Sequence, residues 1–591
     1  AFGGIAQKNG QISPGGAGRH VQADGLVAAR QAGVEFINVG PLESDVPAIA
    51  QAEWLALRPG SDVAVLLGIA HTLHTEGLAD GEFLERYTVG FDVFARYLEG
   101  AEDGVVKSAE WAAGLSDLGA DRIRRLARRM ATERTMISTS WSLTRQDHGE
   151  QPYWAAVAVA AMLGQIGLPG GGIGFGYSAT NYVGSDAFGI PGAALPQGRN
   201  PVRDFIPVAR ISDMLLNPGA EFDYNGQRYR YPDIHMVYWA GGNPFHHHQD
   251  LGRLIEAWRK PDTVIAHEWC WNGLAKHADI VLPCTTALER NDLSYSPRDP
   301  YIIAMRQVAK PFAQSRNDFD IFAGIAARLG VADKFTEGRD EKAWLRWMYE
   351  ETRERSARAG VSLPTYETLQ RDGWYRIEDS PEPKIMLKAF RDDPAANPLT
   401  TPSGRIEIFS RTIDAFGYDD CPGHPAWLEP EEWLGGEPGP WPLHLISNQP
   451  STKLHSQLDH GCHSRAAKIH DREPIVMHPR DAAARNIVDG DLVRVFNSRG
   501  ACMAGAMLDD GVRAGVVVMS TGAWFDADPT VGDIVFCKHG NPNVLTRDQG
   551  TSRLAQGPSA QSCLVEIERF DAEPPPVSAF EPPEIVGTDC G

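Results

Sequence analysis

Four short polar loops carry residues suited to bind the phosphates of a nucleotide. They are Gln7-Lys8-Asn9-Gly10, Ser44-Asp45, Ser140-Trp141-Ser142 and Gly241-Gly242-Asn243-Pro244, each beside an expected β-strand. Phosphate binding needs small residues for close approach of the backbone, and N–H donors at the start of a helix. One Gly-Asn turn at a strand end is usually only a turn. Loops of this kind in two separate α/β units favour a ligand of dinucleotide size.

Two carboxylates extend this hypothesis. Asp45 and Asp62 are suited to accept hydrogen bonds from the N1–H and the amino group of a guanine. No strict G-x-G-x-x-G pattern opens either unit, which argues against an ordinary NAD enzyme.

Three adjacent histidines, 246–248, suggest a metal site at first sight. Successive side chains point in different directions, so three adjacent histidines rarely converge on one ion. Contact of one of them with a phosphate or another ligand is the better functional interpretation, and a solvated loop is the alternative.

The loop that contains Ser142 is followed by Arg145, His148 and Glu150. These three residues are either catalytic groups or a capping set at the start of a helix. Ser142 has no His and Asp partners at a motif spacing and G-x-S-x-G is absent, which disfavours a serine hydrolase. H-E-x-x-H, Walker A and kinase motifs are also absent. The residues alone predict a large α/β enzyme with a nucleotide-like ligand, and leave its chemistry open.

Two α/β units must position these loops. Residues 1–170 alternate expected strands, at 34–39 and 135–139, with helices from 62 and over 154–163. The pattern restarts in a second unit, 171–432, with strands at 235–239, 263–266 and 278–283 and with helical insertions. Strand, polar loop and helix in this order are typical of a doubly wound sheet, which binds ligands at the carboxyl ends of its strands.

The third part, residues 433–570, follows a Pro/Gly/Trp-rich linker and is predicted to be a β-barrel. Short strands are expected at 443–447, 492–496, 516–519 and 563–567, and Asn497-Ser498-Arg499-Gly500 is a hairpin signal. The Pro-rich tail, 571–591, is expected to be extended or disordered. The predicted fold is therefore α/β, with two doubly wound dinucleotide-binding units and a C-terminal β-barrel.

Composition excludes several classes of protein. The 591 residues carry a net charge of −21 without a basic block, which makes nucleic acid and anionic membranes poor partners. No apolar run reaches the roughly 18 residues of a membrane span. The eight cysteines form no C-x-x-C pair and are too few for a disulfide scaffold, as expected of thiols in a reducing compartment. No signal peptide is visible, so we expect a cytoplasmic protein, or a periplasmic one if a twin-arginine leader precedes Ala1.

The motifs in order resemble the dimethyl sulfoxide reductase family of molybdenum enzymes, in particular its biotin sulfoxide and trimethylamine N-oxide reductases. The resemblance spans about residues 1–568. The stretches that carry it are Phe2-Gly3-Gly4, Lys8-Asn9-Gly10-Gln11, Arg58-Pro59-Gly60-Ser61-Asp62, Ser140-Trp141-Ser142-Leu143-Thr144-Arg145, His148-Gly149-Glu150-Gln151, Gly241-Gly242-Asn243-Pro244, Ala278-Asp279-Ile280-Val281-Leu282-Pro283, Ser447-Asn448-Gln449-Pro450, Lys453-Leu454-His455-Ser456 and Gly540-Asn541-Pro542-Asn543-Val544-Leu545-Thr546. One departure is Ser140, where many relatives have glycine.

The resemblance implies a cofactor and a reaction. The cofactor is a bis-molybdopterin guanine dinucleotide with molybdenum, one dinucleotide in each α/β unit and the barrel over both. The reaction is reduction of an S-oxide or N-oxide (biotin sulfoxide, methionine sulfoxide, trimethylamine N-oxide or dimethyl sulfoxide), with electrons from a donor protein or a reduced carrier. The alternatives are another molybdopterin branch, such as a formate dehydrogenase or nitrate reductase, and a cofactor-binding fragment without turnover.

In this family the serine that binds the metal, and the aromatic residues of the active site, lie before the segment matched by Ala1. No residue here is therefore assigned as a catalytic residue or metal ligand, and we expect the 591-residue chain alone to be inactive. The residues implied to contact the dinucleotides are Lys8, Asn9, Asn38, Ser44, Asp45, Arg58, Gly60, Asp62, Ser140, Trp141, Ser142, Arg145, His148, Gly241, Asn243, His248, His267, Glu268, Asp279, Ser447, Asn448, Gln449, His455, Ser456, Asn541, Asn543, Gln556 and Gly557.

Overall fold

The computed structural model describes residues 1–10, 17–177, 191–296, 299–378, 384–528 and 534–584. Two parts with parallel sheets and a C-terminal barrel follow one another along the chain, so the predicted mixed α/β architecture with a barrel is confirmed. Short 3-10 helices lie at Glu43–Asp45 (η1), Ala48–Ala50 (η2), Trp141–Arg145 (η3), Val208–Arg210 (η4), Ala275–His277 (η5) and Pro542–Val544 (η6).

In the first part, Phe2 joins two pairs of parallel strands. β1 (Ile37–Val39) pairs with β2 (Glu53–Leu55), and β4 (Met136–Thr139) pairs with β5 (Gly172–Phe175). Phe2 forms parallel bridges to the ends of β1 and β4. Because parallel strands end at the same edge of a sheet, the loops that follow Phe2, β1 and β4 begin side by side.

Helix α3 (Asp62–Thr75) is the centre of the helical layer of this part. It packs against α6 (Ala109–Ser116), α7 (Ala120–Thr132) and α8 (Gln151–Met162), and nearly all of its residues are buried. Its run of apolar residues covers every side of the helix, as expected where neighbours surround it. The remaining helices of this part are α1 (Gln7–Gly10), α2 (Gln22–Gln31), α4 (Gly81–Tyr87) and α5 (Phe91–Leu98).

The second part contains the parallel strands β8 (Met236–Ala240), β9 (Thr263–Glu268) and β10 (Ile280–Pro283), in the order β8-β9-β10. All three lie where the sequence predicts strands. Two helices follow β8, α10 (Pro244–His247) and α11 (Leu251–Trp258), and α11 packs on α9 (Ile211–Leu216). A hairpin of β6 (Glu221–Tyr224) and β7 (Gln227–Arg230) precedes this sheet.

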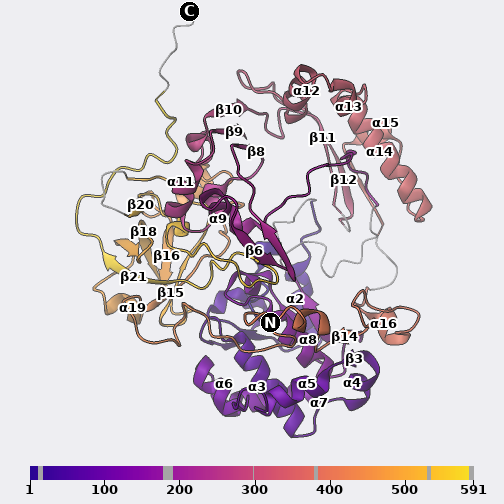
Figure 1. Ribbon diagram of the computed structural model, residues 1–591, viewed down its shortest axis with the longest axis vertical. Helices are drawn as coiled ribbons and strands as arrows, with labels where there is room; N and C mark the ends of the chain where they lie inside the picture. The colour runs from indigo at the N-terminus through magenta and orange to yellow at the C-terminus, as the bar shows by residue number, and fades with distance from the viewer. Residues whose placement is uncertain (11–16, 178–190, 297–298, 379–383, 529–533, 585–591) are drawn as a thin grey trace, which may run out of the picture.

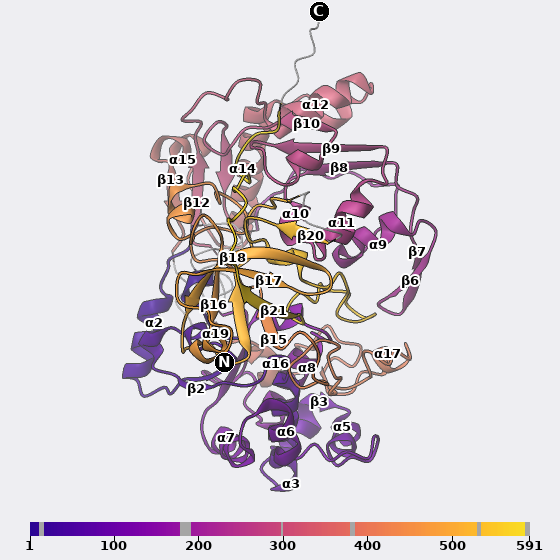
Figure 2. The ribbon, with the colours of Figure 1, turned by 90° about the vertical axis from the view of Figure 1, so that its left-hand side faces the viewer.

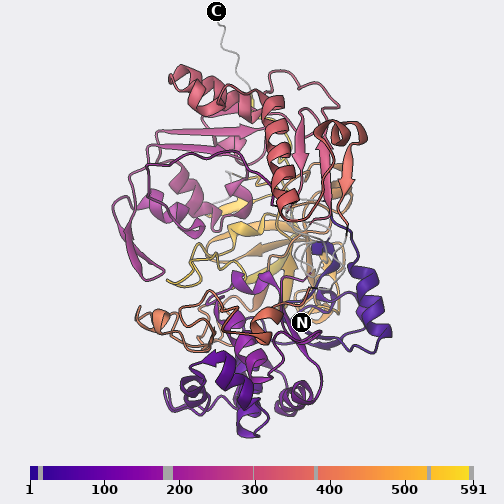
Figure 3. The ribbon, with the colours of Figure 1, turned by 90° about the vertical axis from the view of Figure 1, so that its right-hand side faces the viewer.

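A small antiparallel sheet forms the inserted region. Its strands are β11 (Asp292–Ser294), β12 (Tyr301–Met305) and β13 (Trp374–Arg376), and its helices are α12 (Asp318–Arg328), α13 (Ala332–Thr336), α14 (Glu341–Arg358) and α15 (Tyr366–Asp372). Figure 3 shows α14 beside this sheet in the upper part of the molecule.

The chain then returns to the first part, although the sequence places residues up to 432 in the second. β14 (Ile406–Glu407) pairs with β3 (Thr88–Val89), and Phe390, on α16 (Lys388–Asp392), is buried in the core around α3. One further short helix, α17, spans Arg411–Asp414. Periodicity does not reveal this return, because the pairing partners are far apart in sequence.

Six strands close the barrel and a seventh lies on its edge. The strands are β15 (Leu443–Ile446), β16 (Pro474–Met477), β17 (Leu492–Phe496), β18 (Gly500–Leu508), β19 (Val516–Met519), β20 (Val535–Cys537) and β21 (Leu564–Arg569). Their order is β16-β19-β15-β21-β17-β18-β20, and pairing of β16 with β18 closes the ring. The predicted hairpin at 497–500 joins β17 and β18. Two short helices, α18 (Cys462–Ala466) and α19 (Pro479–Ala483), lie between strands.

The barrel contacts both sheet-containing parts. Figure 2 shows it at mid-height, with the second part above and the helical layer of the first part below. Among the described residues, no helix is both long and apolar enough to cross a membrane.

Candidate functional site

Three of the predicted loops meet at the carboxyl edge of the first sheet. Gly4 lies in the left-handed region at φ +81°, and a Cβ there would stand 2.5 Å from the carbonyl oxygen of Asp45. A Cβ at Gly3 would stand 2.8 Å from the hydroxyl oxygen of Ser142. The loop after Phe2 therefore runs between the loops after β1 and β4, and glycine is needed because the backbones approach so closely.

A lysine and a carboxylate give this edge its charge. Lys8 Nζ donates to the carbonyl oxygen of Gln449 at 2.6 Å, so the barrel reaches the edge as well. Burial raises the pKa of Asp45 to about 7, and nearby Lys8 opposes that rise. Burial lowers the pKa of Lys8, which Asp45 partly offsets. The side chain of Asn9, which follows Lys8 on α1, lies outside the described residues.

Two further predicted residues lie buried at this edge. Asn38 donates through Nδ2 to the carbonyl oxygens of Leu42 and Glu43, at 2.9 and 3.1 Å, and thereby shapes the loop after β1. Asp62 lies in the first turn of α3, where burial raises its pKa to about 6 against the effect of hydrogen bonds from its own N–H and from Gln146. Burial thus makes the carboxylate of Asp62 costly to ionise.

Other predicted residues of this part have structural contacts. Arg58 pairs with Asp117 at 2.7 Å, Gly60 has a φ of +80°, and Ser44 is exposed. Ser140 accepts a hydrogen bond from the N–H of Ser142 at the start of η3. The exposed ring of Trp141 lies 5.9 Å from that of Phe175.

The turn before α8 is bound to the barrel. His148, at φ +55°, donates its N–H to the carbonyl oxygen of Thr551 at 3.0 Å, and the carbonyl oxygen of Arg145 accepts from the N–H of Gln561 at 2.7 Å. Glu150 makes no capping bond and instead accepts from the hydroxyl of Thr551 at 2.6 Å. The capping alternative is thus wrong for Glu150, because its carboxylate finds its partner in the barrel.

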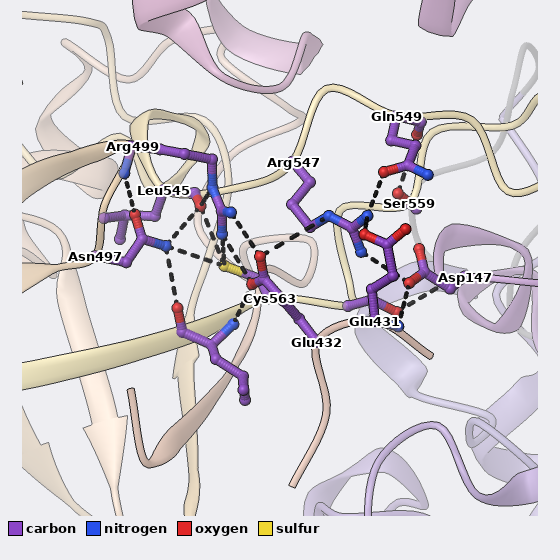
Figure 4. A network of polar contacts seen from close by, with 12 residues as sticks. Asp147, Glu431, Glu432, Asn497, Arg499, Leu545, Arg547, Gln549, Ser559 and Cys563 are labelled. Carbon is purple, nitrogen blue, oxygen red and sulfur yellow. Dashed lines mark hydrogen bonds and ion pairs between the residues drawn. The ribbon is translucent and has the colours of Figure 1, made fainter. Parts of the chain in front are cut away.

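An ion-pair network reinforces this junction (Figure 4). Arg547 of the barrel pairs with Asp147 at 2.8 Å and also with Glu431 of the linker. Arg499, in the β17–β18 hairpin, binds both carboxylate oxygens of Glu432, at 2.6 and 2.9 Å. Linker, first part and barrel are therefore fastened together at one place.

The second sheet presents predicted residues at its own carboxyl edge. Gly241 has a φ of +90°, and Asn243 caps α10 by accepting from the N–H of Phe245 at 3.1 Å. Burial raises the pKa of Glu268, at the end of β9, to about 7, although a hydrogen bond from Asn272 opposes the shift. This edge repeats the arrangement of the first sheet, with small residues and a buried carboxyl group at the strand ends.

Three predicted residues of this part have protein partners at their polar atoms. His267 lies 2.7 Å from Asp318 and 2.8 Å from the hydroxyl of Tyr238. His248 lies 2.9 Å from the hydroxyl of Ser212. Asp279 accepts from the N–H of Val264 at 2.7 Å. These contacts hold the fold.

Barrel loops cover α10. Asn541 donates through Nδ2 to the carbonyl oxygen of Phe245 at 2.8 Å, and Asn543 donates in the same way to that of His246. The ring of His455 lies 5.5 Å from that of His246, and burial lowers the pKa of both imidazoles, which keeps them neutral. Of the three adjacent histidines, only 246 and 247 face this region, and no group of three metal-binding side chains occurs among the described residues.

The remaining predicted residues of the barrel bind other segments of the protein. The N–H of Ser447 donates to Gln561 at 3.1 Å, and Asn448 accepts from the hydroxyl of Ser520 at 2.7 Å. Gln556 donates to the carbonyl oxygen of Asp223 at 2.8 Å, while the N–H of Gly557 donates to the hydroxyl of Thr551 at 3.2 Å. The carbonyl oxygen of Ser456 accepts from the indole of Trp524 at 2.7 Å.

A buried ion quartet, unforeseen in the sequence, anchors the loop 453–460. Lys453 Nζ lies 2.9 Å from Glu473 and 3.1 Å from Asp459, and Lys468 Nζ lies 2.8 and 2.9 Å from the same carboxylates. Burial alone would raise the pKa of Asp459, but Lys468, His539 and Lys453 outweigh it and lower this pKa to about 2. No motif links the four residues, so only the fold reveals them.

Unpaired buried atoms test whether a polar ligand fits here. Asn38 Oδ1, Gln449 Oε1, His246 Nδ1 and Trp239 Nε1 are buried without a hydrogen-bond partner in the described part of the chain. Such atoms are rare in folded proteins and costly unless something satisfies them. Asn38 lies on β1, Trp239 on β8, His246 on α10 and Gln449 on the barrel loop after β15. A ligand with both donors and acceptors fits the regions of these four atoms.

Comparison with known proteins names the family. The sequence matches the family described as Molybdopterin oxidoreductase over residues 20–328, and the Molydopterin dinucleotide binding domain over residues 443–564. The chain belongs to the molybdopterin oxidoreductase family. This family and its dinucleotide binding domain imply a molybdopterin cofactor.

Several characterised relatives cover nearly the whole chain. It is 47% identical to biotin sulfoxide reductase of Cereibacter sphaeroides, over 96% of this chain and 76% of the relative. It is 43% identical to dimethyl sulfoxide/trimethylamine N-oxide reductase of the same organism, over 95% of this chain and 70% of the relative. It is also 43% identical to trimethylamine-N-oxide reductase of Haemophilus influenzae, over 94% of this chain and 69% of the relative.

One solved structure shares the molybdopterin oxidoreductase fold. Acetylene hydratase from Pelobacter acetylenicus superposes with a TM-score of 0.66 at 18% identity, over 93% of this chain and 76% of that chain. At this identity the likeness concerns the fold alone.

Proposed function

We propose that this molybdopterin oxidoreductase reduces S-oxides or N-oxides by oxygen-atom transfer, with a molybdenum ion carried by two molybdopterin guanine dinucleotides. The observation that carries the proposal is the 43–47% identity to S-oxide and N-oxide reductases, which runs through both sheet-containing parts and the barrel. The repeated strand-edge arrangement supports one dinucleotide for each part, in two doubly wound units.

The chain's own residues would hold the two dinucleotides. Lys8 supplies a positive charge for a phosphate at the first edge, while Asp62 and Asn38 Oδ1 accept from N–H groups. At the second edge Asn243 and Glu268 take corresponding positions. When bound, the molybdenum group supplies the two-electron oxygen-atom transfer, for which a donor protein or a reduced carrier returns the electrons.

The test combines cofactor analysis with turnover. The purified protein is analysed for molybdenum and guanine nucleotide, then assayed with reduced viologen and biotin sulfoxide, methionine sulfoxide, trimethylamine N-oxide or dimethyl sulfoxide. Turnover of an S-oxide or N-oxide by the loaded protein supports the proposal. Reduction of nitrate by reduced viologen, or oxidation of formate by oxidised viologen, in its place supports the other branch.

We also propose that the protein acts in the cytoplasm. All seven cysteines among the described residues are free thiols, as in proteins of a reducing compartment. Fractionation of cells of the natural host tests this, and recovery of the protein from the periplasm would contradict it.

A further inference from the structure

Residues 571–584 carry no helix or strand, but they are bound firmly to the barrel. The N–H of Ser578 donates to Asp526 Oδ2 at 2.7 Å, and its hydroxyl donates to Asp526 Oδ1 at 2.8 Å. Lys538 donates to the same hydroxyl at 2.8 Å. We call this segment the strap.

The strap also reaches the second sheet-containing part. Lys276, in η5, donates to the carbonyl oxygen of Ala579 at 2.9 Å, and the side chain of Ala579 is buried. Figure 1 shows this yellow segment leaving the barrel and running along the second part. The strap therefore joins the two.

Phe580 is the apolar anchor of the strap. Its ring lies 4.9 Å from that of His539 and 5.4 Å from that of Trp524, both edge-to-face. His539 and Trp524 are themselves buried, at 0% and 5% exposure. Aromatic pairs of this geometry stabilise more than their buried area alone.

Trp524 in turn holds the loop 453–460. Its indole N–H donates to the carbonyl oxygen of Ser456 at 2.7 Å, and its backbone N–H donates to Asp459 at 3.0 Å. A Cβ at Gly522 would overlap the carbonyl oxygen of His455, so the segment of Trp524 lies directly against the loop. His539 completes the contact, with Nδ1 at 3.0 Å from the carbonyl oxygen of Trp524.

We infer that Phe580 and Ser578 are positioning residues for the loop 453–460. The strap fixes Trp524 from outside, while the ion quartet fixes the base of the loop from inside. His455 and Ser456, which the loop carries, are then held beside the ring of His246, whose Nδ1 is unpaired. The link from strap to loop stands on contacts alone, and its importance for the cofactor rests on the proposed function.

Hydrogen–deuterium exchange tests the link. Phe580→Ala removes the anchor, Phe580→Tyr retains the ring, and Phe570→Ala is the matched control. Phe570 precedes the strap and packs against the barrel cluster of Ala501, Met503 and Phe536. We expect exchange in peptides covering 453–468 to be about tenfold faster in Phe580→Ala, and unchanged in Phe580→Tyr and Phe570→Ala. In Phe580→Ala, peptides covering β17 and β18 should be unaffected.

A second measurement follows the cofactor. The rate at which guanine nucleotide leaves the loaded protein should rise about tenfold in Phe580→Ala alone. Unchanged loop exchange, or equal acceleration in Phe570→Ala, overturns the inferred link. Faster loop exchange with unchanged nucleotide release overturns the positioning role. A protein that binds no guanine nucleotide refutes the proposed function, while loop exchange still decides the link.

Discussion

Arg547 offers the most direct test of how the barrel is fastened to the first part. The substitution Arg547→Met keeps much of the side-chain length and removes the charge. Arg547 and Asp147 are almost fully buried, with side-chain exposures of 8% and 7% and a separation of 2.8 Å. The substitution leaves Asp147 with the N–H of Glu431 as a donor but without its cation.

The expected effect is large because the remaining carboxylate is buried. Breaking a buried ion pair by removing one partner costs about 3–5 kcal/mol. Since about 1.4 kcal/mol corresponds to a factor of ten, local opening of residues 145–151 should increase about a hundred- to a few-thousand-fold. Hydrogen–deuterium exchange of peptides covering this turn measures the change. Adding Asp147→Asn to Arg547→Met should restore part of the protection, because the unpaired charge is removed.

The matched control is the exposed pair of Arg122 and Glu53, at 44% and 47% exposure. Arg122→Met should cost no more than about 1 kcal/mol, because water solvates both charges. If peptides covering residues 145–151 exchanged equally fast in Arg547→Met and Arg122→Met, the contact between the barrel and the first part would not depend on its buried charges. That result would refute this reasoning.

Three further predictions concern the two edges. Glu268→Gln should be more stable than the parent protein at pH 8 and as stable as the parent below pH 4.5. The pKa of Glu268 is raised to about 7 in the folded protein, so the parent loses stability as the pH rises and this buried carboxyl group ionises. Thermal unfolding midpoints of both proteins across this pH range measure the effect, and a difference that does not change with pH would contradict it. Gln449→Leu should stabilise the cofactor-free protein, because it removes an unpaired buried oxygen, yet reduce the affinity for guanine nucleotide by up to about tenfold. Urea unfolding measures the gain in stability and nucleotide analysis measures the loss of affinity. An unchanged affinity would count against a ligand contact of Gln449. Gly4→Ala should displace the loop of Asp45 and lower cofactor content in molybdenum analysis, whereas Gly77→Ala, equally left-handed but with open space around it, should not.

The sequence predicts the barrel strands that have the usual composition. The stretches at 443–447, 492–496, 516–519 and 563–567 are rich in apolar residues and each contains valine or isoleucine, and each forms a strand in the structure. β18, the longest strand at Gly500–Leu508, escapes prediction because glycine, alanine, cysteine and methionine carry no strand signal. It is a strand because it is buried between β17 and β16, where small side chains fit.

The loops at the strand edges are predictable for a local reason, whereas the partners of their side chains are not. A glycine or a small polar residue after an apolar run marks the end of a strand and the closeness of the backbone there. That Gln556 would bind Arg210, or that His148 would bind the Thr551 loop, depends on segments hundreds of residues away. Sequence patterns therefore locate the edges of a binding site better than they assign a role to each residue.

Whether a buried polar atom has a hydrogen-bond partner separates residues that hold the fold from residues that can bind a ligand at these edges. Asn541 and Asn543 resemble Asn38 in type and burial, but their amide oxygens accept bonds from Asn543 N–H and from Thr546, and their amide nitrogens hold α10. Asn38 uses only its nitrogen within the protein, and its oxygen is left buried and unpaired. A fold that needed Asn38 only as a scaffold would gain stability by pairing that oxygen. The oxygen of Asn38 is thus free to accept from a ligand, whereas the paired asparagines hold the fold around it.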